Sequence, residues 1–172
     1  MAYIYHKVPA KMLGNILYPL NEMKKINQEI YEAAVKKYEG REDLMREMIP
    51  WLNCLWNDVL HFSIVHPTVI KEALFKLGHP FRENFFEVPI EAIDPKRTVI
   101  YLYRRDDNKL ELDEFKPFDP KLIADLAVLS ENAKDYYARS VKAGQKVLAF
   151  HGVAHVLYRG SLDVSDFKII KS

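Results

Sequence analysis

Two histidines, His151 and His155, have the residue type and the spacing to do chemistry. They separate two short apolar runs, Val147–Phe150 and Val156–Tyr158, whose residues favour β-strands. We therefore expect two buried strands that meet at a junction carrying titratable groups. Such a junction is a typical place for a functional cleft.

Plainer explanations exist for each of these groups. The spacing of His151 and His155 matches a helical metal pair, but no cysteine or carboxylate cluster lies nearby, so no metal site is predicted. Any one histidine, taken alone, is better explained as a hydrogen-bonded core residue. Cys54 lies in an apolar stretch, which favours a small buried residue over a nucleophile. Arg41 and Arg46 lie on a short helix candidate, where arginine is either solvated or a clamp for a phosphate.

Length and composition indicate a globular protein of ordinary character. The 172 residues fit one domain, 1–172, with 49% apolar and 28% charged residues. A net charge of +1 gives no basic field that would attract nucleic acid in general. The single cysteine fits a reducing compartment, the N-terminus has no apolar signal core, and no segment approaches membrane-spanning length. These features predict a cytoplasmic protein without a membrane partner.

The strand candidates occur at both ends of the chain and in its middle, without a regular alternation of strand and helix. They are Ala2–Tyr5, Val59–Val65, Phe85–Ile90, Thr98–Arg104, Val147–Phe150, Val156–Tyr158 and Phe167–Ile170. The helix candidates are Pro9–Leu17, a segment capped by Asn21 or Asn27 and closed by Gly40, Arg41–Ile49, His66–Gly78, and Pro120–Ala143 with a restart at Ser130. This order predicts one α+β domain with a mainly antiparallel core sheet, flanked by N-terminal and central helices.

Four short motifs, spread over most of the chain, form a set. They are Ile4-Tyr5-His6-Lys7-Val8 with the segment from Met12 to Leu17, Gly40-Arg41-Glu42-Asp43-Leu44, Asn57-Asp58-Val59-Leu60-His61-Phe62-Ser63 with His66-Pro67, and Gln145-Lys146-Val147-Leu148 with the segment from His151 to His155. Together they resemble the DNA-targeting ADP-ribosyltransferase toxins, the DarT family, and more broadly the ADP-ribosyltransferase fold. The resemblance implies an ADP-ribosyltransferase-like fold with NAD as cofactor, bound by His6 and Arg41.

The sequence departs from that family at the catalytic position. The family carries a catalytic glutamate at the start of the late strand, where this chain has Gln145 or Lys146. A charged lysine neither accepts a proton nor stabilises a developing cation. The active carboxylate then comes from elsewhere, such as Glu131 or Asp135, or the chemistry differs, or catalysis has been lost. His155 is the candidate for a substitute general base, because an unperturbed imidazole titrates near neutral pH.

Three functions are compatible with these residues. The first is an NAD-using ADP-ribosyltransferase-like enzyme with His155 as its catalytic residue. The second, which the missing glutamate favours, is a non-catalytic module that binds a nucleotide, another small-molecule ligand or the end of a nucleic acid. The third is a structural or interaction protein whose histidines belong to the core. For the first two we expect His6, Arg41 and His155 to line one cleft, with nucleotide binding retained and NAD hydrolysis weak or absent.

Overall fold

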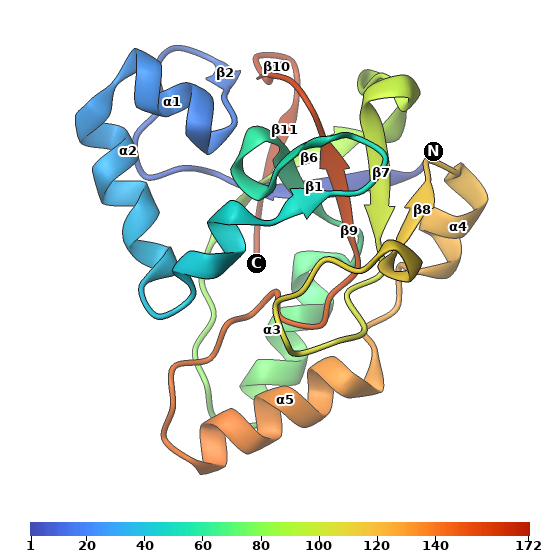
Figure 1. The fold of residues 1–172 in the computed structure, drawn as a ribbon. Helices are drawn as coiled ribbons and strands as arrows, with labels where there is room; N and C mark the ends of the chain where they lie inside the picture. The colour runs from blue at the N-terminus through green and yellow to red at the C-terminus, as the bar shows by residue number, and fades with distance from the viewer.

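A computed structural model describes all residues from 1 to 172 and confirms an α+β architecture with a wholly antiparallel main sheet (Figure 1). The main sheet has seven strands in the order β11-β6-β1-β5-β9-β7-β8. Its strands are β1 (Tyr3–Lys7), β5 (Leu60–Ser63), β6 (Asn84–Pro89), β7 (Thr98–Tyr101), β8 (Phe115–Pro117), β9 (His155–Tyr158) and β11 (Lys168–Lys171). Two smaller sheets pair β2 (Ile16–Leu17) with β10 (Leu162–Asp163), and β3 (Met48–Ile49) with β4 (Cys54–Leu55).

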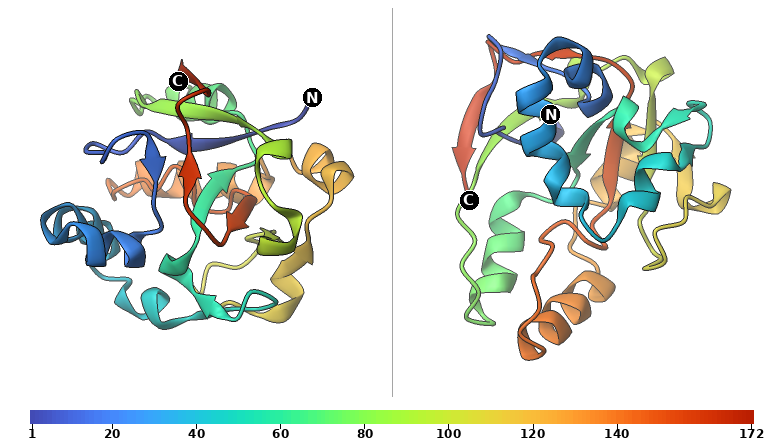
Figure 2. Two further views of the ribbon diagram at one scale, coloured as in Figure 1. Left: turned by 90° about the horizontal axis from the view of Figure 1, so that it is seen from above. Right: turned by 60° about the vertical axis from the view of Figure 1, so that its left-hand side comes forward.

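Five α-helices surround the main sheet. They are α1 (Leu20–Ile26), α2 (Gln28–Val35), α3 (Pro67–Phe75), α4 (Pro120–Asp125) and α5 (Glu131–Lys142). In the right-hand view of Figure 2, α1 and α2 lie in front of the sheet, whereas α3 and α5 lie together at the lower end. None of these helices combines the length and the apolar composition that are needed to cross a membrane.

Three central strands position the candidate site. On β5, His61 and Ser63 are two residues apart and therefore share one face of the sheet. Ser63 pairs with Tyr5 of β1 on one side and with His155 of β9 on the other. The opposite face of β5 carries Phe62, which is fully buried in the largest core cluster. The sheet register thus brings polar residues from three distant parts of the sequence into one row.

Local capping explains where most helices begin. The side chains of Asn27, His66, Asp119 and Ser130 each accept a hydrogen bond from a backbone N–H of the helix that follows. Proline at the first helical position supports α3 and α4, since its fixed φ suits a helix start. The predicted starts after His66, Asp119 and Ser130 are confirmed, and Asn27 is the cap of α2.

The predicted helix over Pro9–Leu17 is wrong. A tight turn replaces it: Gly14 has a φ of +62°, and Leu13 bridges to Ile16 across the turn. Glycine adopts this left-handed conformation without the steric cost that a side chain brings. Ile16 and Leu17 then pair with Leu162–Asp163, so apolar residues with helical spacing are used in a strand instead.

The predicted strand over Val147–Phe150 is also wrong, whereas Val156–Tyr158 is confirmed within β9. Two backbone groups of the first run bond to side chains of α5: Tyr136 Oη accepts from Leu148 N at 3.1 Å, and Tyr137 Oη–H donates to Ala149 O. These two tyrosine side chains provide hydrogen-bond partners that a neighbouring strand would otherwise provide. Gln145 and Lys146 consequently do not begin a strand, and the late strand begins at His155.

Two further elements are shorter than the sequence predicts. The strand beginning at Thr98 ends at Tyr101, because Tyr103 has a φ of +53° that an extended strand does not allow. Within Arg41–Ile49, only Glu42–Arg46 forms a 3₁₀ turn, and Met48–Ile49 forms β3.

Candidate functional site

A cavity of about 580 Å³, the histidine cleft, lies between the α1–α2 pair and strands β1, β5 and β9. Helices α1 and α2 and the turn before them give it an apolar wall that includes Met12, Met23 and Ile30. The polar residues that line it are Asn57 and Ser63, three histidines (His6, His61 and His155) and three lysines (Lys7, Lys11 and Lys37). His6 and His155, which are 149 positions apart in sequence, therefore share one cleft.

Two of the three histidines have a defined tautomer. His6 Nδ1 lies 2.7 Å from Lys7 O, and His155 Nδ1 lies 2.6 Å from Val153 O. A carbonyl oxygen only accepts, so in both rings Nδ1 carries the hydrogen and Nε2 is left as an acceptor. These two rings therefore offer acceptors to a ligand.

The histidines of the cleft are uncharged at neutral pH. Burial lowers the pKa of His6 and the pKa of His155 from 6.5 to about 4 each. Burial also lowers the pKa of His61 well below 6.5, and the nearby Lys37 charge adds to this effect. The polar part of the cleft is consequently a set of neutral hydrogen-bonding groups.

Positive charge gathers at the rim, around Lys37 and Arg41. Arg41 is not among the residues that line the cleft, but its Nη2 donates to Lys37 O at 2.8 Å and its guanidinium lies 5.6 Å from the Tyr38 ring centre. Neither cation has a carboxylate partner, whereas Lys7 and Lys11 form ion pairs of 2.7 and 3.1 Å with glutamates. The pKa of Lys37 is lowered by desolvation in the cleft wall and then by repulsion from Arg41 and Lys7.

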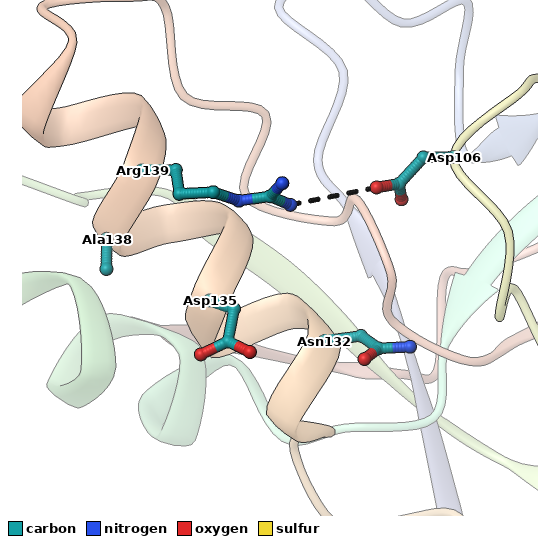
Figure 3. A pocket seen from close by; sticks show the side chains of 5 residues that line it. All are labelled: Asp106, Asn132, Asp135, Ala138 and Arg139. Carbon is teal, nitrogen blue, oxygen red and sulfur yellow. Dashed lines mark ion pairs between the residues drawn. The ribbon is translucent and has the colours of Figure 1, made fainter.

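No aspartate or glutamate lines the histidine cleft. Glu131, at the start of α5, is exposed and pairs with Lys134 at 2.7 Å. Asp135 lines a separate depression beside Asp106 and Arg139 (Figure 3). The structure therefore brings neither carboxylate to His155. No three His, Cys, Asp or Glu side chains are grouped closely enough to hold a metal ion.

His151 belongs to a different set of contacts, the His151 cluster, which contains Tyr103, Asp106, Tyr136 and His151. Asp106 Oδ1 accepts from His151 Nε2–H at 2.8 Å, so Nδ1 is the acceptor for the Tyr103 hydroxyl at 3.0 Å. The imidazole stacks on the Tyr136 ring at 4.1 Å, and Arg139 approaches Asp106 at 3.7 Å (Figure 3). The two histidines of the predicted junction therefore lie in two different environments.

Sequence reasoning missed several polar residues of the cleft, among them Lys37, Asn57 and His61. Lys37 precedes Arg41 by only four positions, and this closeness of two cations in the sequence was the available signal. His61 lies two positions before Ser63 on a predicted strand, so its shared face with Ser63 could be inferred. Asn57 sits in a 3₁₀ turn, Trp56–Asp58, where no periodic pattern indicates a direction.

Comparison with protein-family models, with curated proteins and with solved structures finds no match for this chain. Function is therefore inferred from the geometry and the charge of the histidine cleft. That cleft offers an apolar wall and neutral acceptors and contains no carboxylate; Lys37 in its lining and Arg41 beside it are cations without carboxylate partners.

Proposed function

We propose that this protein binds NAD or a related nucleotide in the histidine cleft, as an ADP-ribosyltransferase-like protein with little or no transferase activity. The observation that supports this most is the pair of cations without carboxylate partners, Lys37 and Arg41, beside a largely apolar cavity that no carboxylate lines. These features match a nucleotide, because its phosphates are anionic and its base is a planar ring.

The cation pair suits the phosphates. The pKa of Lys37 is lowered first by desolvation and then by repulsion from Arg41, and a bound anion would offset that repulsion. Arginine forms charge-assisted and often bidentate hydrogen bonds with phosphate. A cavity of about 580 Å³ lies within the range of pockets that hold small ligands.

The same cleft is poorly equipped for ADP-ribosyl transfer. Transfer from NAD passes through a sugar with developing positive charge, and a carboxylate is the side chain that stabilises such charge. None lines the cleft. His155 is neutral and can accept a proton, but a pKa of about 4 makes it a weak base at pH 7. Binding with slow or absent turnover follows.

The ADP-ribosyltransferase-like fold and a cytoplasmic location are parts of this proposal. The antiparallel sheet, with His6 on β1 and a late strand beginning at His155, supports the fold assignment. The single cysteine, Cys54, is buried and free, which supports a reducing compartment.

Calorimetric titration of NAD and of ADP-ribose into the purified protein tests the binding half. Release of nicotinamide, followed by chromatography over hours, tests the catalytic half. We expect saturable binding of both ligands and slow or undetectable release of nicotinamide. Absence of binding at millimolar ligand would remove the nucleotide proposal, and rapid release of nicotinamide would contradict the proposed loss of activity.

A further inference from the structure

Asn57 is a buried polar residue in the wall of the histidine cleft that the fold leaves without a partner. Its side chain is 1% exposed, and neither Oδ1 nor Nδ2 forms a hydrogen bond with another protein group. Burying an amide without partners is destabilising, so native proteins seldom do it without a reason.

The residues on either side of Asn57 are fully bonded. Trp56 Nε1 donates to Tyr38 Oη at 3.1 Å. The Asp58 carboxylate accepts from Leu55 N at 2.7 Å and from Asn21 Nδ2 at 2.8 Å. The turn that carries Asn57 is therefore firmly held, and a loose local structure does not explain the unpaired amide.

A second unpaired group lies close by in sequence and in the same cleft. His61 Nε2 is buried without a protein partner, and its ring packs 4.5 Å from the Trp56 ring. Asn57 and His61 thus provide neutral hydrogen-bonding atoms to the cleft, whereas Lys37 and Arg41 provide the positive charge. The cleft has a charged part and an uncharged part.

We infer that Asn57 binds the uncharged end of the nucleotide, through a planar ring edge with one hydrogen-bond donor beside one acceptor. An aminopurine edge has this chemistry, and asparagine pairs with it through both amide atoms. A phosphate or a carboxylate would satisfy Nδ2 alone and leave Oδ1 buried and unpaired. This inference rests on the proposed nucleotide binding and names the part of the ligand that the cleft selects.

The amide atoms are shielded from water in the ligand-free cleft. A ring therefore has to shift part of the cleft wall to reach them. Binding then replaces two unpaired buried groups with two hydrogen bonds, which favours a ligand that carries the matching edge over one that does not.

Three probes separate the parts of the ligand. Adenosine 5′-monophosphate carries the donor–acceptor edge, purine riboside 5′-monophosphate lacks the amino donor, and ribose 5-phosphate lacks the ring. Each is titrated calorimetrically into the wild type, into Asn57→Ala and into Asn132→Ala. Asn132 is the matched control, because it is exposed on α5 in the depression that Figure 3 shows.

We expect the wild type and Asn132→Ala to bind adenosine 5′-monophosphate about three- to tenfold more tightly than purine riboside 5′-monophosphate. Asn57→Ala should bind the two alike, and its thermal midpoint should equal or exceed that of Asn132→Ala, because an unpaired amide has been removed. An unchanged preference in Asn57→Ala would overturn the inference.

A clear loss of thermal stability in Asn57→Ala would also overturn it, since the amide would then be bonded in the free protein. Equal binding of all three probes to the wild type would leave the phosphate site of the proposed function standing and remove the role of Asn57. No binding of any probe would remove the proposed function, and the inference with it.

Discussion

The histidine cleft and the His151 cluster are built from similar side chains but differ in how far their hydrogen bonds are completed. In the His151 cluster both ring nitrogens of His151 are bonded to side chains, one to Asp106 and one to Tyr103. In the cleft, His6 and His155 each bond one backbone carbonyl and keep Nε2 free. Asn57 has no partner at all.

This difference indicates a structural role for the His151 cluster and a ligand-binding role for the histidine cleft. The His151 cluster connects the loop after β7 with α5 and with the segment before β9, and its groups already stabilise one another. The cleft keeps neutral polar atoms without hydrogen-bond partners, and buried polar atoms of this kind lower stability unless a ligand pairs with them. Lys37 in its lining and Arg41 beside it also lack carboxylate partners. We therefore expect ligand binding at the histidine cleft, and we expect the His151 cluster to contribute to the stability of the fold.

The largest expected effect that distinguishes the two regions is the pH dependence of stability. His6 and His155 have a pKa of about 4 when folded and near 6.5 when unfolded, so the unfolded state binds more protons between these values. Stability is complete above pH 6.5 and falls as pH drops towards 4, by roughly 1–3 kcal/mol per histidine after allowance for partial exposure.

Urea denaturation at pH 7.5, 5.5 and 4.5 checks this. The double variant His6→Gln, His155→Gln should lose less stability than the wild type over the same interval. Parallel slopes for the wild type and the double variant would show that these two histidines are not held neutral by the fold.

Ligand affinity should depend on the cation pair. If Lys37 and Arg41 contact the phosphates, Lys37→Ala and Arg41→Ala should each weaken NAD binding by about 1.5–3 kcal/mol, the range for hydrogen bonds to charged groups. Lys36→Ala and Arg46→Ala are the matched controls; Arg46 is 83% exposed and pairs only with Asp43. Calorimetry on the four variants measures the difference, and equal losses in variants and controls would move the anion site elsewhere.

Substitutions in the His151 cluster should lower the stability of the fold and leave ligand affinity unchanged. His151→Ala removes the partner of the Tyr103 hydroxyl, one of the partners of Asp106 and the stacking on Tyr136, so the free energy of unfolding should fall by about 1–2 kcal/mol. Nucleotide affinity should not change, because none of these residues lines the cleft. Chemical denaturation and calorimetry on the same sample provide both values; a loss of affinity without a loss of stability would reverse the roles of the two regions.

Much of the fold could be predicted from local signals. Caps such as Ser130 and Asp119 fix where helices begin, and strands such as Thr98–Tyr101 are recognisable from β-branched and aromatic residues with turn signals beside them. The Val147–Phe150 run could not be predicted correctly, because its composition is that of a strand. Its backbone partners are tyrosines of α5, and tertiary contacts of this kind override composition.

The site could be predicted only in outline. His6 and His155 were identifiable as polar residues near strand ends. Both line the cleft, although the register pairs Ser63 with Tyr5 and with His155 and not with His6. Both ring nitrogens of His151 form hydrogen bonds because Asp106 and Tyr103, almost fifty residues away in the sequence, lie beside it. His155 has no such side-chain partner. Spacing within the sequence contains no information about such partners.

The smallest expected effect concerns His155 itself. Its Nε2 offers one neutral acceptor to the ligand, so His155→Ala should weaken NAD binding by only about 0.5–1.5 kcal/mol, the value of one neutral hydrogen bond. Any slow release of nicotinamide should cease, because His155 is the candidate proton acceptor in a cleft without a carboxylate. His151→Ala provides the control, since that imidazole is outside the cleft. Turnover that survives in His155→Ala and disappears in His151→Ala would assign the chemistry to the His151 cluster and reverse the comparison between the two regions.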